Sequence, residues 1–363
     1  MSTMSNKFFY GMFLSLTLLG TSYTQNRIIE FNNPDIYYEG RIMYNDSSAV
    51  FSWSRTSASI WFEGTGISAI LQDADTANYY NVIFDDSNIL KIHTDSVKRI
   101  YSLASGLPEG KHKIELFKRT EWDKGKTYFY GFETSDNTVV LSPPPPPQRK
   151  IEFFGNSITC GYAMEDYSGN DSWFGYFENN YLSYAAITAR HFNAQYYCTS
   201  KSGIGVMVSW FPLIMPEMYD RLDPTDSTSK WDFAKFTPDI VVINLFQNDS
   251  WIVNMPDNEQ FKYRFGTKAP DENFIINSYE DFVATIRDKY PDASIICVLG
   301  NMDATKEGSP WPGYVQKAVN QLNDPKIYTL FFKYKNTPGH PKVDEQQAMA
   351  DSLIEFIEKN ISW

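Results

Sequence analysis

The chain has 363 residues, of which 42% are hydrophobic, and this is enough for the cores of two ordinary domains. Its formal net charge of −12 at pH 7 opposes a polyanionic partner, because nucleic-acid-binding proteins need a basic patch that displaces counterions from phosphates. Nucleic acids and anionic membranes are therefore excluded as partners. Aromatic residues make up 16% of the chain, which is consistent either with a surface that binds sugar rings or with β-rich packing.

The N-terminal residues have the pattern of a secretory signal peptide. A short polar segment that includes Lys7 precedes an apolar run from Phe8 to Leu19, and small residues follow up to Thr24. The run is shorter than the roughly 20 residues that a membrane-spanning helix needs, and no other segment is long and apolar enough. We therefore predict a signal peptide over residues 1–24, export to the periplasm or the medium, and no membrane span.

Residues 27–142 predict an all-β domain. Apolar and polar residues alternate in short runs that are punctuated by Gly, Asn, Asp and Pro, as in a sandwich or jelly roll. The clearest predicted strands are 49–53, 59–62, 67–71, 79–84 and 112–116.

A proline segment marks the predicted domain boundary. Five consecutive prolines, Pro143–Pro147, can join neither a helix nor a central strand, so we place a linker at residues 143–149. From residue 150 to 363 apolar strands alternate with amphipathic helices, which predicts an α/β domain with a parallel sheet covered on both faces. The predicted strands are 150–154, 194–198, 240–245 and 294–299, and the predicted helices are 182–191, 279–289, 314–322 and 343–359.

Cysteine and histidine usage gives no sign of a metal or cofactor. Cys160, Cys198 and Cys297 can close at most one disulfide, and whether any pair does so stays open. The four histidines are widely scattered, without the spacing of zinc ligands. We expect neither a metal nor a cofactor.

Four loops of the α/β domain carry residues suited to acyl transfer. Ser157 lies between a predicted strand and a helix, Gly203 follows the second strand, and Asn248 follows the third. His340 stands between Gly339 and Pro341 ahead of the last helix, where a general base is more plausible than a core histidine. Each signal alone has an ordinary structural explanation, such as a helix N-cap for Ser157 or a turn for Asn248.

Taken in the order Ser, Gly, Asn, His, these loops resemble the block motifs of the SGNH hydrolase superfamily. The resemblance implies that Ser157 is the nucleophile and His340 its base. It also implies an oxyanion hole made by the amides of Ser157 and Gly203 and the Asn248 side chain. One departure bears on mechanism: Thr337 occupies the place three residues before His340 where the family usually has an Asp.

The N-terminal half resembles the jelly-roll domain of carbohydrate esterase family 2. The residues that carry this resemblance are Gly40-Arg41, Phe51-Ser-Trp53, Ile60-Trp-Phe-Glu-Gly64, Tyr79 to Asp85, Gly106 to His112 and Phe117 to Glu121. Members of that family remove acetyl groups from xylan, mannan and related glycans, and some use a Ser-His dyad in which a backbone carbonyl holds the histidine. Thr337 fits the dyad variant. We therefore expect His340 to be oriented by a backbone carbonyl or by an acid from elsewhere in the chain; Asp344 is a weaker candidate.

The expected substrate is an acetylated plant-type polysaccharide or oligosaccharide. Four tryptophans in loops near the predicted site are candidates for binding it: Trp173, Trp210, Trp251 and Trp311. Two alternatives stay open, namely an esterase or lipase for other small acyl esters and a noncatalytic glycan-binding protein that kept the fold.

Overall fold

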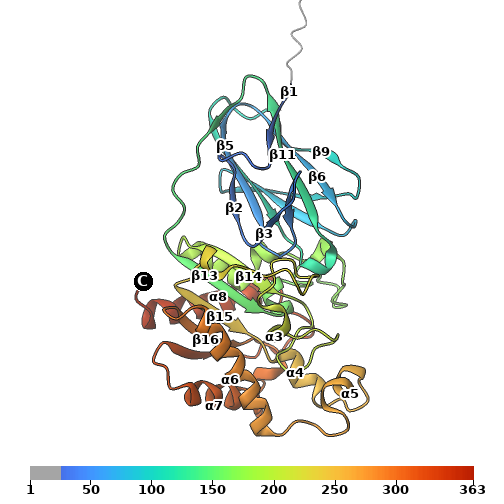
Figure 1. The fold of residues 1–363 in the computed structure, drawn as a ribbon, viewed down its shortest axis with the longest axis vertical. Helices are drawn as coiled ribbons and strands as arrows, with labels where there is room; N and C mark the ends of the chain where they lie inside the picture. The colour runs from blue at the N-terminus through green and yellow to red at the C-terminus, as the bar shows by residue number, and fades with distance from the viewer. Residues whose placement is uncertain (1–25) are drawn as a thin grey trace, which may run out of the picture.

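The computed structural model describes residues 26–363 as a β-sandwich joined to an α/β domain (Figure 1). The predicted signal peptide, residues 1–24, lies outside the described residues. Within residues 26–363 no helix has both the length and the hydropathy that crossing a membrane requires. The predicted fold class, an all-β region followed by a parallel-sheet α/β domain, is confirmed.

The jelly-roll domain consists of two antiparallel sheets that enclose one apolar core. One sheet has the order β3-β4-β11-β6-β9, with β1 also paired to β11, and the other has the order β12-β5-β10-β7-β8, with β2 also paired to β5. Alternate residues of both sheets point inward, so that Phe51, Phe62, Phe129 and Phe132 are fully buried between them. The strands are β1 (Asn26–Glu30), β2 (Tyr37–Glu39), β3 (Ile42–Tyr44), β4 (Ala49–Phe51), β5 (Ser57–Glu63), β6 (Ile67–Asp73), β7 (Tyr79–Phe84), β8 (Asn88–His93), β9 (Arg99–Ala104), β10 (Lys111–Lys118), β11 (Thr127–Ser135) and β12 (Val139–Leu141).

The α/β domain is built on five parallel strands in the order β14-β13-β15-β16-β17. Its strands are β13 (Lys150–Gly155), β14 (Gln195–Ser200), β15 (Ile240–Asn244), β16 (Ser294–Leu299) and β17 (Ile327–Phe331). Its α-helices are α1 (Ser157–Cys160), α2 (Tyr184–His191), α3 (Met215–Met218), α4 (Gln247–Ile252), α5 (Glu259–Phe265), α6 (Glu272–Lys289), α7 (Trp311–Leu322) and α8 (Val343–Asn360). Short 3-10 turns complete it: η1 (Trp122–Lys124), from the jelly roll, with η2 (Gly175–Phe177), η3 (Asn180–Leu182), η4 (Phe233–Lys235) and η5 (Asp303–Thr305).

Helices cover both faces of this sheet. Phe153 and Val242 belong to the apolar cluster under α2 and α8, whereas their neighbours Phe154 and Ile243 belong to the cluster under α6 and α7. Successive strand residues point to opposite faces, so a strand buried on both sides is largely apolar, as the first four residues of β15, Ile240 to Ile243, are. The carboxyl ends of the strands are left as the edge that is open for a site.

Most of the predicted elements exist, with shifted boundaries. The predicted strand 294–299 matches β16, while the helix predicted over 279–289 begins earlier, at Glu272, where Asp271 caps it. The elements of the α/β domain that were not predicted include β17, α3, α5 and α4, the last of which begins where a turn was the ordinary explanation of Asn248. Cys160, Cys198 and Cys297 are all buried and free of disulfides.

Polar side chains of the jelly roll enter the α/β domain and fix the two together. Trp53 donates from Nε1 to the carbonyl of Leu222 at 2.8 Å, and its ring belongs to the apolar cluster on the α6 side of the sheet. Arg41, 2% exposed, pairs at 2.9 Å with Glu152 of β13, which has no exposed surface. In Figure 1 the proline segment runs down the outside of the sandwich to β13.

Candidate active site

Ser157 lies at the junction of β13 and α1, where local sequence forces a sharp turn. Asn156 caps the helix by accepting the N–H of Ile158 at 3.0 Å, and Gly161 ends it in the left-handed conformation. A Cβ at Gly155 would lie 2.1 Å from Oγ1 of Thr159, so only glycine allows the helix to approach the strand this closely. The turn places the Ser157 hydroxyl at the open edge of the sheet, where the side chain is 6% exposed.

His340 meets Ser157 from the loop before α8. Its Nε2 lies 2.9 Å from the Ser157 Oγ, and its Nδ1 lies 2.7 Å from Oδ2 of Asp171. Because a carboxylate can only accept, Nδ1 carries the proton and Nε2 is free to accept the serine proton. This is the tautomer that a general base for Ser157 requires.

The orienting acid comes from a loop that the sequence did not single out. Asp171 has a φ of +48° and lies in the loop that follows α1, with its Oδ2 also accepting the backbone N–H of His340 at 2.7 Å. Gly339 is required beside it, since a Cβ there would lie 2.6 Å from the carboxylate. Of the two expected ways to orient His340, the structure therefore contains an acid from elsewhere in the chain and no dyad held by a carbonyl.

Asp171 is held in its charged form. Burial alone would raise its pKa, but the hydrogen bonds from His340 and from the Lys342 ammonium, 2.9 Å from Oδ1, outweigh burial and lower the pKa below its usual range. The two positions that the sequence offered for an acid beside His340, residues 337 and 344, do not contact its ring. Thr337 donates to Glu345, and Asp344 is exposed at the start of α8.

The expected oxyanion donors line the same pocket as Ser157 and His340. Gly203 has a φ of +82°, and Asn248 lies in the first turn of α4 after β15. One hydrogen of the Asn248 amide goes to the carbonyl of Ile204 at 2.8 Å, which leaves the second for a ligand. Trp210 donates from Nε1 to Asn248 Oδ1 at 3.0 Å and so fixes which way the amide faces.

Asp249, next to Asn248, holds the loop that follows Gly203. Its buried carboxylate accepts the backbone N–H groups of Val206, Met207 and Val208 at 2.7 to 3.1 Å. Burial raises the pKa of Asp249 to about 6 even though these three donors favour the charged form. The Asn-Asp pair after β15 is therefore more than a turn, because the second residue shapes the loop around the first.

Three of the four predicted tryptophans reach this pocket, which has a volume of about 520 Å³. Trp173 and Trp210 are 62% and 43% exposed, and Trp251 is half-buried with its Nε1 bonded to Asp303. The exception is Trp311. It begins α7, is only 5% exposed, and packs edge-on against Phe246 with ring centroids 5.0 Å apart, so it is a core residue.

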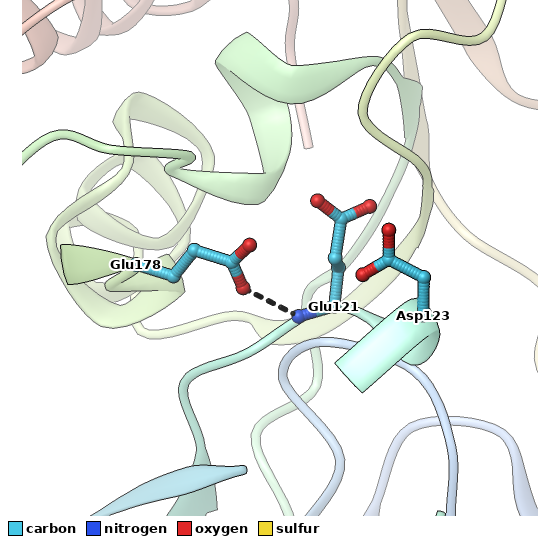
Figure 2. A group of neighbouring side chains, drawn as sticks. All are labelled: Glu121, Asp123 and Glu178. Carbon is cyan, nitrogen blue, oxygen red and sulfur yellow. Dashed lines mark hydrogen bonds between the residues drawn. The ribbon is translucent and has the colours of Figure 1, made fainter. Parts of the chain in front are cut away.

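A group of three carboxylates lies beside the pocket where the two domains meet. Glu121 and Asp123 come from the jelly roll and Glu178 from the α/β domain, and Figure 2 shows the three side chains converging. Their oxygens could hold a cation, but the Lys124 ammonium lies 3.2 Å from Asp123 and 3.4 Å from Glu178, and Lys201 lies 3.0 Å from Asp123. These ammonium groups supply the positive charge, and the donor set fits a metal poorly.

Comparison with known proteins assigns each of the two domains to a family. Residues 38–144 match the family model for the carbohydrate esterase 2 N-terminal domain, and residues 153–325 match the GDSL-like lipase/acylhydrolase family. The chain is 33% identical to the cellulase/esterase CelE of Acetivibrio thermocellus over 92% of its own length but spans only 40% of that protein. It is 26% identical to an acetylxylan esterase/glucomannan deacetylase of Cellvibrio japonicus, with 92% of this chain and 91% of that protein aligned.

Solved structures give the same result. A family two carbohydrate esterase from Clostridium thermocellum, in complex with cellohexaose, is 34% identical, with a TM-score of 0.79 over 89% of this chain and 98% of that one. A family two carbohydrate esterase from Cellvibrio japonicus is 25% identical, with a TM-score of 0.81 over 92% of this chain and 98% of that one. The chain therefore belongs to the family two carbohydrate esterases and is a carboxylic ester hydrolase.

Proposed function

We propose that this protein is an exported serine esterase that removes O-acetyl groups from plant-type polysaccharides, such as xylan and glucomannan, through an acetyl-enzyme. The observation that carries the proposal is the hydrogen-bonded series Ser157, His340, Asp171 at an open pocket walled by tryptophans. The substrate class is supported by the Cellvibrio relative, an acetylxylan esterase and glucomannan deacetylase aligned over 91% of its length.

Acetyl transfer to the enzyme uses the two reacting residues and their acid. The Ser157 Oγ attacks the acetyl carbonyl while its proton passes to Nε2 of His340, and the Asp171 carboxylate stabilises the imidazolium that forms. His340 then gives this proton to the sugar oxygen as the carbon–oxygen bond breaks. The deacetylated glycan leaves and the acetyl group remains on Ser157.

Hydrolysis of the acetyl-enzyme repeats these proton transfers with water. His340 takes a proton from the water that attacks the acetyl carbonyl, and Ser157 leaves with that proton restored, which releases acetate. In both halves the negative oxygen faces the N–H groups of Ser157 and Gly203 and the second amide hydrogen of Asn248. Donors placed in advance need no reorganisation when the charge develops.

The pocket walls and the N-terminus favour a glycan outside the cell. Flat aromatic faces such as the exposed Trp173 and Trp210 bury the apolar face of a sugar ring. A polysaccharide does not cross a membrane, so an enzyme that acts on it must be exported. The signal-peptide pattern of residues 1–24 agrees with that requirement.

The test compares the full-length wild type with Ser157→Ala on acetylated xylan, glucomannan and pectin, with acetate release as the readout. We expect release by the wild type and a loss of about 10⁴-fold or more in the variant, because the nucleophile is gone. Turnover of Ser157→Ala close to wild type would refute the mechanism. Hydrolysis of p-nitrophenyl acetate without acetate release from any glycan would instead indicate an esterase for small esters, and glycan binding without any hydrolysis would indicate a noncatalytic protein.

A further inference from the structure

One carboxylate of the jelly roll bonds directly to the loop that carries the proposed oxyanion donor. Glu121 lies at the end of the segment that joins β10 to η1, and its side chain has no exposed surface. Its Oε2 accepts the backbone N–H of Ser202 at 2.7 Å, and Ser202 immediately precedes Gly203. The contact therefore crosses the domain boundary and ends at Ser202, which itself lines the pocket beside Gly203.

Glu121 is itself firmly placed. Its backbone N–H donates to Glu178 Oε2 at 3.0 Å, the contact drawn in Figure 2, and its carbonyl accepts the buried Lys118 ammonium at 3.2 Å. The carboxylate itself also accepts from the buried Cys160 thiol, whose Sγ lies 3.8 Å from Oε2. A buried carboxylate with this support can hold a fixed position instead of swinging to solvent.

Gly203 needs such support because glycine does not fix its own backbone. At a φ of +82°, the direction of its N–H depends on how its neighbours are held. On the C-terminal side, Asp249 ties down residues 206–208 through three N–H groups. On the N-terminal side, the Glu121 carboxylate is the matching tie, through Ser202.

We propose that Glu121 is a positioning residue of the esterase reaction, which fixes the Gly203 N–H toward the oxyanion by holding the N–H of Ser202. The inference rests on the proposed role of Gly203 in ester hydrolysis. Through Glu121 the jelly-roll domain would contribute to the geometry of the active site, whereas the bonds of Arg41 join the two domains without reaching the site. Because every ester forms the same oxyanion, the effect of Glu121 extends to substrates too small to touch the jelly roll.

The experiment measures kcat and KM of Glu121→Ala and Glu121→Gln in the full chain on p-nitrophenyl acetate. Loss of a whole oxyanion donor costs about 10²- to 10³-fold in kcat, so a displaced donor is expected to cost about tenfold in Glu121→Ala with little change in KM. Glu121→Gln keeps an acceptor of the same length for the Ser202 N–H and is expected to recover most of that loss. If Glu121→Ala does not fold, Glu121→Gln is compared with the wild type directly, and a loss of about tenfold or more in its kcat would overturn the inference, because this variant keeps the acceptor.

The matched control is Glu165→Gln, which removes another carboxylate that joins the domains. Glu165 pairs with Arg119 at 2.6 Å and Lys91 at 2.9 Å, both from the jelly roll, and it does not contact residues 201–203. We expect Glu165→Gln to lower the Tm about as much as the Glu121 variants do and to keep the kcat of the wild type. An unchanged kcat in folded Glu121→Ala would overturn the inference, and so would a Glu121→Gln variant as impaired as Glu121→Ala.

A third result would also overturn the positioning role of Glu121. If the Glu121 variants lost activity only on acetylated glycans and kept it on p-nitrophenyl acetate, Glu121 would serve substrate binding and the positioning role would be wrong. These outcomes are separate from failure of the proposed function, since a wild type that hydrolyses p-nitrophenyl acetate through Ser157 but no glycan still allows the comparison.

Discussion

Asp171→Asn tests whether the carboxylate outside the expected motif serves catalysis. In the wild type one oxygen accepts both the Nδ1 and the backbone N–H of His340, each at 2.7 Å, and the other accepts Lys342. An asparagine cannot satisfy both sides. With its oxygen toward His340, its amide hydrogens face the Lys342 ammonium; turned around, they face Nδ1 and impose the tautomer in which Nε2 already carries a proton.

The size of the loss follows from this geometry. In serine proteases the same substitution at the orienting acid costs about 10⁴-fold in kcat. Here Lys342 already offsets part of the charge that Asp171 offers to the imidazolium, so we expect a smaller loss, about 10²- to 10³-fold, which corresponds to about 3 to 4 kcal/mol in the activation barrier. The KM for a small ester is expected to change little, because the missing interaction acts in the transition state.

The assay is kcat on p-nitrophenyl acetate at neutral pH, with Asp344→Asn as the control. Asp344 is four residues from His340 in sequence but exposed, so its removal is expected to leave kcat unchanged. Adding Thr337→Asp to Asp171→Asn is not expected to rescue activity, since residue 337 faces the Glu345 carboxylate. A kcat of Asp171→Asn within about threefold of wild type would refute the triad and return His340 to a dyad.

Two further predictions concern stability. Burial, followed by the charge of Glu121, raises the pKa of Glu178 from 4.5 to about 8. Between these two pH values the folded protein holds a proton that the unfolded chain has lost, so the free energy of unfolding should fall as pH rises from about 5 to 8. In urea unfolding, Glu178→Gln should flatten this pH dependence. An unchanged dependence would mean that other groups cause it. A fragment that starts at Gln148 leaves the buried Glu152 without Arg41, and removing one partner of a buried ion pair costs about 3 to 5 kcal/mol. We therefore expect this fragment to have poor solubility and a low Tm. A stable, fully active fragment would contradict firm packing of the two domains.

The sequence predicted best what depends on neighbours along the chain. Ser157 and His340 stand in short motifs at strand and helix ends, and the alternation of apolar strands with helices determines where those ends meet. Asp171 was missed because its role depends on a contact 169 residues away, and its own surroundings, Ser-Gly-Asn-Asp-Ser, read as an ordinary polar loop. Only the missing acid at position 337 indicated that a substitute had to exist.

The tryptophans show a second limit of prediction from the sequence, because one residue that we predicted to bind substrate is a core residue. Trp173, Trp210 and Trp311 all stand near glycine or proline, and composition alone does not tell a pocket wall from a core residue. What separates them is the helix that begins at Trp311 and turns that ring toward Phe246. A helical reading extended back three residues from Tyr314 would have placed Trp311 on the apolar face of α7 with Val315 and Ala318.

In the proposed site the residues assigned to the reaction lie in local motifs, and the groups that hold them come from distant parts of the chain. Asp171 holds His340 across 169 positions, Asp249 holds the amides of residues 206–208 across about 40, and Glu121 reaches Ser202 across 81 from another domain. All three are acids that accept N–H groups, a use in which charge strengthens the hydrogen bond. Such contacts fix geometry without touching the substrate, so substitutions at these acids should lower kcat more than they raise KM. The chemistry of the site can therefore be located from short motifs, whereas the precision of its geometry depends on how the whole chain is folded.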